Sequence, residues 1–130
     1  MKVELKDNGS VLLIVVFVIA LLSAVAMGIL QLDTEEIQLM RNQIYAVQAI
    51  ATAEAGLNDA FSEIRTDSSW TTGFTDKAFN GGTYTVDVNG TTITSTGTTA
   101  QSFVARVEAD ITTGTTSPYI IRIDNLRINE

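Results

Sequence analysis

The chain of 130 residues contains no cysteine, no histidine and a single proline, Pro118. Without cysteine there is no disulfide and no thiolate ligand for a metal ion. Without histidine, the commonest general base and zinc ligand is missing. The aspartates and glutamates are too scattered for a calcium-binding loop, and no side chains pair as nucleophile and base. We therefore expect no enzymatic activity, no metal site and no cofactor.

Positive charge is also scarce. Eight lysines and arginines stand against fifteen aspartates and glutamates, which gives a net charge of −7. Two of the basic residues, Lys2 and Lys6, lie at the N-terminus beside Glu4 and Asp7, so the whole acidic excess belongs to the rest of the chain. Binding to phosphate backbones requires a basic surface. We therefore expect no nucleic-acid partner.

What the chain does contain is a long uncharged apolar run, Val11 to Leu32. This length matches the roughly 20 residues that a helix needs to cross a bilayer. A buried helix of a globular domain usually keeps a polar edge, and this run has none. Lys2, Lys6 and the α-amino group precede the run, although Glu4 and Asp7 balance the lysines, and Asp33, Glu35 and Glu36 follow it. Positive charge on the near side favours a cytoplasmic N-terminus. The sequence predicts a single membrane-spanning helix.

The helical pattern continues after Leu32, because apolar residues recur every three or four positions. No proline occurs before Pro118 to interrupt it. We predict one continuous helix over residues 10–65, with Ser10 as its N-cap. Its second half would carry an apolar stripe that the rest of the chain must cover. The stripe is interrupted only by Glu54 and otherwise consists of Ile37, Met40, Ile44, Val47, Ile50, Leu57, Phe61 and Ile64.

The C-terminal half reads as an antiparallel sheet. Residues 66–82 are rich in Thr, Ser, Gly and Asp, so we expect an irregular connection, pinned by Trp70, Phe74 and Phe79. Alternating patterns predict strands at 83–88, 102–111 and 119–128, with the loop 112–118 on the surface. A sheet of about four strands, apolar on one face, would cover the helix stripe. We predict an α+β fold.

Two details of the sheet can be stated more closely. Asn89-Gly90 is a strong signal for a two-residue hairpin turn, which would pair Val86 with Ile93. The last strand should turn Tyr119, Ile121 and Ile123 inward, alongside the inward row of 102–111, and bulge or bend at Asn125. The inward row of 102–111 is Phe103, Ala105, Val107, Ala109 and Ile111.

The predicted chain has three parts: a charged leader that ends in Gly9, an apolar helix that continues as an amphipathic helix, and a small sheet. This layout resembles the type IV pilin superfamily, including the pseudopilins. The segment at 49–60, AIATAEAGLNDA, is similar to the N-terminal helix of PilX-like minor pilins, where A-E-A-G recurs. The resemblance covers residues 8–65, and over the sheet it is only architectural. Ile14 departs from the pattern, since most pilins carry a glutamate there. That departure is commoner in minor pilins and tip pseudopilins.

The resemblance implies a processed structural subunit. A prepilin peptidase would remove the leader, residues 1–9, by cutting between Gly9 and Ser10, and Ser10 would become the N-methylated first residue. The precursor would cross the inner membrane once. An assembly ATPase and its membrane platform would then build a helical filament of this chain or of several pilins at the cell surface. Two alternatives remain open: a type II secretion pseudopilin, or an uncleaved single-pass protein with a small binding or sensing domain.

Residues 10–32 would form the core of such a filament, residues 33–65 the amphipathic half of the helix, and residues 66–130 the globular sheet domain. Glu54 is either a solvated carboxylate or a half-buried one that pairs with Arg106, Arg122 or a neighbouring subunit. Gly56 belongs to a line of small residues with Ala49, Ala53 and Ala60, which would touch either the chain's own sheet or another helix. Gly28 would loosen locally in a filament, as a similar region often does in pilins. The residues expected to exchange lipid for neighbouring helices include Val11, Leu12, Leu13, Ile14 and Phe17.

Overall fold

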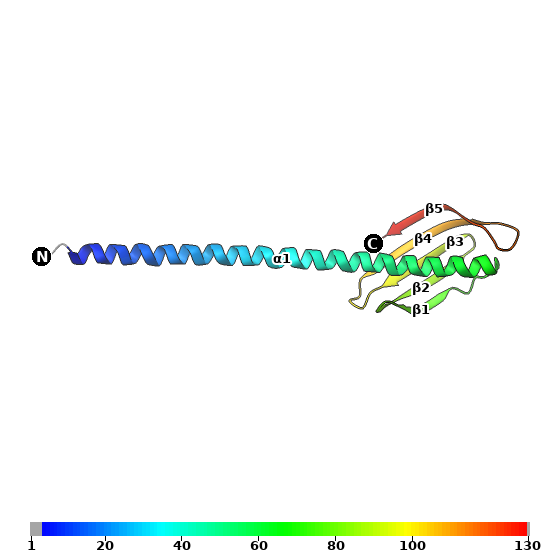
Figure 1. Cartoon of the computed structure of the whole chain (residues 1–130), viewed down its shortest axis with the longest axis horizontal. Helices are drawn as coiled ribbons and strands as arrows, with labels where there is room; N and C mark the ends of the chain where they lie inside the picture. Colours follow the sequence, from blue (N-terminus) through cyan, green and yellow to red (C-terminus); the bar gives the residue numbers. More distant parts are fainter. Residues whose placement is uncertain (1–3, 130) are drawn as a thin grey trace. The chain divides into compact units, whose positions relative to one another are not determined.

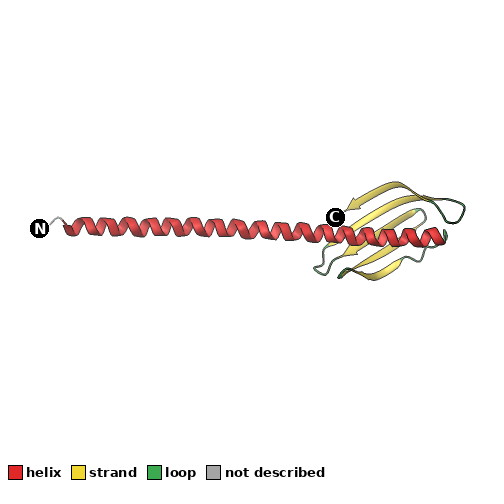
Figure 2. Cartoon of the chain, in the orientation of Figure 1, coloured by secondary structure: helices red, strands yellow, loops and turns green. Residues whose placement is uncertain are grey.

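The computed structural model describes residues 4–129, and the side chains of residues 9–129. The described chain has one helix, α1 (Glu4–Thr66), followed by five strands that form one antiparallel sheet in chain order (Figures 1 and 2). The α+β class is confirmed, with five strands in place of about four. The chain divides into two compact units, Met1–Arg41 and Asn42–Glu130. The strands are β1 (Phe74–Phe79), β2 (Gly82–Asn89), β3 (Thr92–Thr98), β4 (Val104–Thr113) and β5 (Ile121–Asn129).

Helix α1 begins at Glu4, six residues before the predicted start. Ser10 is therefore inside the helix and is not its N-cap. The physical reason is that the residues before Gly9 include good helix formers and no proline. The other end, at Thr66, lies one residue beyond the predicted end, and the Ser69 amide donates to the Asp67 side chain (2.9 Å) just after it. Residues 1–3 of the predicted leader lie outside the described residues.

The helix stripe that packs on the sheet is the line of small residues. Gly56 is buried, and a Cβ added there would lie 2.4 Å from the Ser95 hydroxyl oxygen. A Cβ on Gly97 of β3 would lie 2.4 Å from the backbone nitrogen of Ala53. Helix and sheet therefore approach more closely than larger side chains would permit, and the interpretation that this line touches the chain's own sheet is confirmed. The buried helix residues are Ala49, Thr52, Ala53, Gly56, Leu57, Ala60 and Ile64.

The predicted stripe is correct only in part. Leu57 and Ile64 are buried, and Phe61 packs partly against the core. The earlier members are exposed and lie N-terminal to Ala49, the first buried residue of the helix. The sheet therefore covers a shorter length of helix than the pattern implied. The exposed members are Ile37, Met40, Ile44 and Val47.

Residues 74–79 form strand β1, so the prediction of an irregular connection over all of 66–82 is wrong. A tight hairpin joins β1 to β2 through Asn80 and Gly81, whose φ angles are 46° and 82°. Two positive φ angles in succession are those of a type I′ turn, for which Asn-Gly is the preferred pair. Trp70 and Phe74 stack with ring centroids 5.2 Å apart and pack against the core as expected. Phe79 is 42% exposed.

The β2–β3 hairpin turns one residue later than predicted. Asn89 pairs with Thr92, so the loop is Gly90 and Thr91, and Val88 rather than Val86 faces Ile93. In this loop only Gly90 has a positive φ, +62°, which matches a type II′ turn with glycine first. The register differs from the predicted one by two residues, and an even shift leaves each side chain on its face. The apolar side chains of these strands therefore lie on the same face of the sheet as predicted.

Strand β4 buries its inner row as predicted, with Ala105, Val107, Ala109 and Ile111 all 5% exposed or less. Phe103 lies just before the strand and is half-buried against Tyr45, with the ring centroids 5.4 Å apart.

Strand β5 contains the predicted bulge. Ile111 pairs with Ile123 and Asp110 pairs with Asn125, so Asp124 is the extra residue, next to the predicted position. Ile121 packs partly against the core. Ile123 lies on the same face but stays 48% exposed, so its predicted burial is wrong.

Candidate functional site

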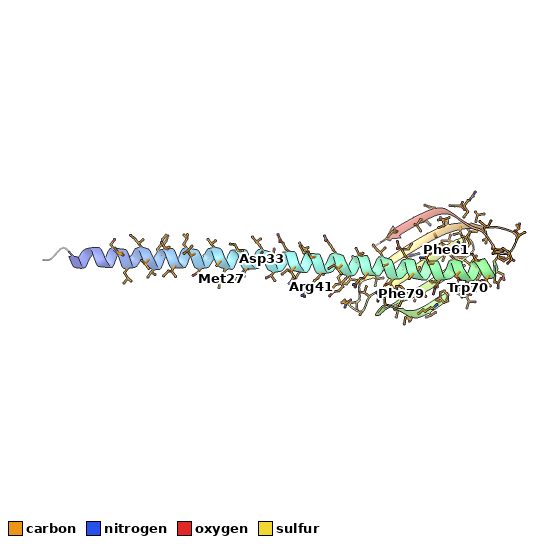
Figure 3. The ribbon with its side chains drawn as sticks, in the orientation of Figure 1. Met27, Asp33, Arg41, Phe61, Trp70 and Phe79 are labelled. Carbon is orange, nitrogen blue, oxygen red and sulfur yellow. The ribbon has the colours of Figure 1, made fainter. Side chains whose placement is uncertain are left out.

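The first candidate surface is the apolar part of α1. In the described chain, one helical segment is long and apolar enough to span a membrane, and none of it is buried. Side chains project all around this part of the helix (Figure 3). Exposed apolar surface is unfavourable in water by about 25 cal/mol per Å², so contact of this surface with lipid or with other helices would be favourable. The predicted assembly residues here are all exposed: Val11, Leu12, Leu13, Ile14 and Phe17.

Two hydroxyl groups in and next to this segment bond to the backbone of the helix. The Ser23 hydroxyl donates to the Ile19 carbonyl at 2.8 Å, and the Thr34 hydroxyl donates to the Leu30 carbonyl at the same distance. Such backbone bonding lets a hydroxyl sit among apolar side chains without an unpaired donor. The helix runs through Gly28 without a break, and a Cβ there would meet nothing within 4 Å. Local loosening at Gly28 in a filament stays a prediction.

The predicted processing junction, Gly9–Ser10, lies on an exposed part of α1. A Cβ added to Gly9 would meet nothing within 4 Å. Packing against the described residues therefore does not require a glycine there. Cleavage and N-methylation at this junction stay predictions.

Within this chain Glu54 is solvent-exposed, as the solvated interpretation predicts, and it is not a half-buried partner of Arg106 or Arg122. The reason is that the buried side of α1 follows Ala53, Gly56 and Ala60, which leaves Glu54 outside the contact with the sheet. The arginines suggested as its partners bind other carboxylates. Arg106 pairs with Glu108 at 3.2 Å, and Arg122 pairs with Asp124 at 2.8 Å. Pairing of Glu54 with a neighbouring subunit stays a prediction.

A polar cluster that the sequence did not predict ties α1 to β1 and β2. The Lys77 ammonium donates to the Asp59 carboxylate at 2.6 Å and lies 4.4 Å from the centre of the Phe74 ring. The Tyr84 hydroxyl donates to the same carboxylate oxygen. The bond from Lys77, followed by the bond from Tyr84, lowers the pKa of Asp59. The same Asp59 bond raises the pKa of Lys77, while burial raises the pKa of Tyr84.

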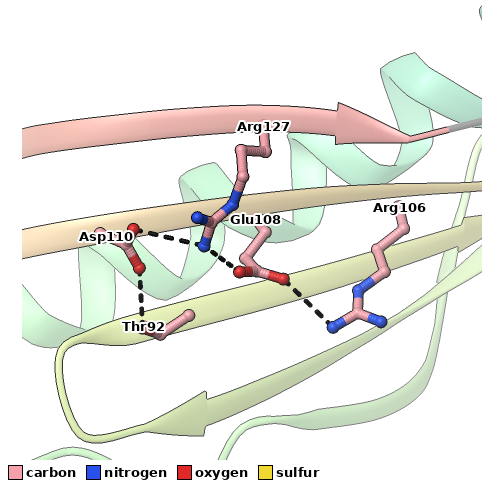
Figure 4. A network of polar contacts seen from close by, with 5 residues as sticks. All are labelled: Thr92, Arg106, Glu108, Asp110 and Arg127. Atoms are coloured by element: carbon pink, nitrogen blue, oxygen red, sulfur yellow. Dashed lines mark hydrogen bonds and ion pairs between the residues drawn. The ribbon is translucent and has the colours of Figure 1, made fainter.

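A second network lies on the face of the sheet that is turned away from the helix (Figure 4). Arg127 of β5 binds Glu108 of β4 and lies 3.3 Å from Asp110. The Thr92 hydroxyl donates to Asp110 at 2.8 Å, and Arg106 completes the network through Glu108. These contacts connect β3, β4 and β5 and hold the last strand in register. Over the part of the chain that the structure describes, no cluster of ligand residues could hold a metal ion.

No protein-family model, curated protein or solved structure compared with this chain matches it. The candidate functional surfaces are thus defined by the chain itself. They are apolar surfaces on α1 that the rest of the described chain does not cover, and a small sheet domain with paired charges. Such surfaces can pack against lipid or against other helices.

Proposed function

We propose that this protein is a structural subunit of a type IV pilus-like extracellular filament. One observation carries the proposal: α1 exposes apolar side chains all around Val11–Leu32, and the same helix ends in a segment buried against a sheet. The apolar segment has the length to lie in a bilayer before assembly. After assembly, equivalent helices of neighbouring subunits would replace the lipid, and the acidic sheet domain would face solvent.

Processing would separate these two states. A prepilin peptidase would cut between Gly9 and Ser10 and free an amino terminus at the end of the apolar helix. Loss of the charged leader removes groups that resist leaving the cytoplasmic surface. The assembly ATPase and its membrane platform would then transfer subunits from the inner membrane to the filament. A type II secretion pseudopilin would share this route and differ in its partners.

An uncleaved single-pass protein with an extracytoplasmic binding or sensing domain is the rival function. Two observations favour it. Helix α1 continues through the Gly9–Ser10 junction, and Ile14 stands where most pilins carry a glutamate. On this reading the apolar segment would stay in lipid permanently.

The intact mass and N-terminal sequence of the protein, taken from its native membranes and from the sheared surface fraction, decide between these functions. We expect a chain that starts at Ser10 in the sheared fraction. A Gly9→Val variant should accumulate as the full-length precursor in the membrane, whereas a Lys6→Arg variant should be processed normally. Wild-type protein that starts at Met1 and stays in the membrane would overturn the filament proposal and favour the anchored domain.

A further inference from the structure

A pocket of about 220 Å³ lies between α1 and one end of the sheet. Three segments line it: α1 through Gln48, Ala51 and Thr52, the β1–β2 hairpin through residues 79–82, and the β3–β4 loop through residues 99–101. Figure 1 shows these two connections at the same end of the sheet, next to the helix. All three segments belong to the compact unit Asn42–Glu130. The pocket is therefore formed without the apolar part of α1.

Contacts within the chain fix the walls of this pocket. The Thr99 amide donates to the Phe103 carbonyl at 2.9 Å, and the Phe103 amide donates to the Thr99 hydroxyl at 3.1 Å, so the β3–β4 loop is closed on itself. A Cβ added to Gly82 would collide with the Thr98 carbonyl oxygen, so the hairpin lies directly against the end of β3. A site that is already held in place loses little conformational freedom when a ligand binds.

One wall of the pocket is an aromatic ring that the fold leaves exposed. Phe79, at the end of β1 (Figure 3), lines the pocket and is 42% exposed. Its ring packs against the ring of Tyr84, with the centroids 6.3 Å apart and the planes inclined by 58°. Tyr84 is itself buried, and its hydroxyl donates to Asp59. The chain thus supports the Phe79 ring on one side and leaves part of its surface open.

The polar side chains around the pocket carry no charge. Three of them are amides, those of Gln48, Asn80 and Gln101, and all three residues are exposed. Among the described residues that line the pocket, none is Asp, Glu, Lys or Arg, although these types make up 18% of the chain. An ionic ligand would lose hydration here and gain no counter-charge. The net charge of −7 also disfavours a phosphate-bearing ligand.

We propose that this pocket binds one ring of a neutral saccharide. The C–H face of the sugar would lie on Phe79, because the positive C–H groups are attracted to the negative face of an aromatic ring. The sugar hydroxyls would bond the amides of Gln48, Asn80 and Gln101, since hydroxyls and amides both donate and accept. The volume corresponds to about seven waters at about 30 Å³ each, which is room for a single ring.

A peptide is the other neutral ligand that amides can bind. Peptides that dock on a sheet usually add a strand to its edge. The edge beside the pocket is β1, which has a bulge between Phe74 and Lys77 and a positive φ of 45° at Asp76. Bulges prevent an edge strand from pairing with another chain. These features favour the saccharide. The inference goes beyond the filament function and does not depend on it.

Saturation-transfer NMR on the full chain tests the proposal, in a detergent whose headgroup is not a sugar. The probes are the methyl glycosides of glucose, galactose, mannose and N-acetylglucosamine, each added alone. We expect transfer from the protein to the ring C–H protons of at least one probe. Its Kd should be on the order of 1 mM, because so small a ligand makes few contacts.

Variants of the pocket locate the binding. Phe79→Leu keeps an apolar side chain without the ring and should weaken binding about tenfold, whereas Phe79→Tyr should retain it. Ala51→Met should abolish binding, because a long side chain on this lining residue fills the pocket. Gln48→Ala should weaken binding about fivefold through the lost hydrogen bonds. Gln43→Ala is its matched control and should bind as the wild-type chain does, since Gln43 is an exposed glutamine of the same helix outside the pocket.

No transfer to any of the four probes would overturn the proposal. Binding that persists unchanged in Phe79→Leu and Ala51→Met would also overturn it, because the sugar would then lie elsewhere. Stronger transfer to an acetylated and amidated triglycine than to any sugar would assign the pocket to a peptide. All the substituted positions are exposed, and circular dichroism would verify that the variants fold. The filament function is judged separately, from the N-terminus of the wild-type chain.

Discussion

The two parts of α1 are both apolar but differ in what surrounds them. From Val11 to Leu32, no side chain is buried by the rest of the described chain. From Ala49 to Ile64, one side of the same helix packs against the sheet, and Ala49, Ala53 and Ala60 are fully buried. Large apolar residues dominate the exposed part, and small ones dominate the buried face. Apolar character alone therefore does not indicate which part of this helix belongs to the fold.

Residue size gives the reason for the difference. Small side chains allow the helix backbone to approach β3 so closely that Gly97 has no room for a Cβ. Large side chains all around a helix cannot pack on one small sheet, and they suit a surrounding of lipid or of several helices. Changes in the first part should alter insertion and assembly and spare the fold. Changes in the second part should do the reverse.

The largest effect should come from charge in the exposed part. Replacing Leu21 and Leu22 together by arginine should make membrane insertion less favourable by about 3 kcal/mol for each residue. The measurement is the fraction of protein that resists alkaline extraction from membranes. Conservative Leu21→Ile and Leu22→Ile changes should leave that fraction unchanged, and circular dichroism of the arginine variant should still show the sheet. Full membrane retention of the arginine variant would contradict a membrane-spanning role.

Sequence alone predicted the helix well, because apolar periodicity without proline leaves few alternatives. It did not resolve which side of the helix faces the sheet. Two candidate rows, one of large residues and one of small, run along the second half of α1. The choice between them depends on how closely β3 approaches, which is set by Gly97 and by the buried Ser95. That information lies about 40 residues away in the chain, and helical spacing cannot supply it.

In the sheet, too, the sequence indicated the elements better than their exact positions. Asn80-Gly81 is a hairpin signal as strong as Asn89-Gly90, but the surrounding Thr, Gly and Asp residues concealed strand β1. The Asn89-Gly90 signal in turn located the second hairpin to within one residue but not its register. The pair between Asp59 and Lys77 had no signal at all, since the two residues are 18 positions apart and lie on different elements. A contact of this kind can be identified only once the fold has shown which elements lie next to each other.

A smaller effect should come from closing the space between helix and sheet. Gly97→Ala places a methyl group 2.4 Å from the Ala53 nitrogen and 2.5 Å from the Ala49 carbonyl oxygen. Backbone atoms cannot move aside as a flexible side chain can, so the helix must shift. We expect a loss of about 1–3 kcal/mol in the free energy of unfolding. Urea unfolding of the full chain in detergent micelles, followed by the fluorescence of the single tryptophan, Trp70, would measure it.

Gly28→Ala is the matched control for that change, because the same methyl group meets nothing within 4 Å in the exposed part of α1. Alanine also has a higher helix propensity than glycine, so this variant should unfold no earlier than the wild-type chain. The comparison would then separate the effect of the added methyl group in open space, in α1, from its effect against the helix backbone, in β3. A Gly97→Ala variant as stable as Gly28→Ala would show that the buried part of α1 does not rest tightly on β3.

The smallest effect should come from removing the Asp59 carboxylate, which connects the buried part of α1 to Lys77 and Tyr84 of the first hairpin. Hydrogen bonds from Lys77 and Tyr84 lower the pKa of Asp59, so the folded state prefers the ionised carboxylate. This stabilisation is complete above the unfolded pKa of about 3.9 and disappears as the pH falls through the lower folded pKa. Because Asp59 and Lys77 are both more than 40% exposed, Asp59→Asn should cost less than about 1 kcal/mol at pH 7. Thermal unfolding of both proteins from pH 7 to pH 2 should show the gap closing on acidification. A gap that stays constant would mean that the Asp59 charge adds nothing to this contact.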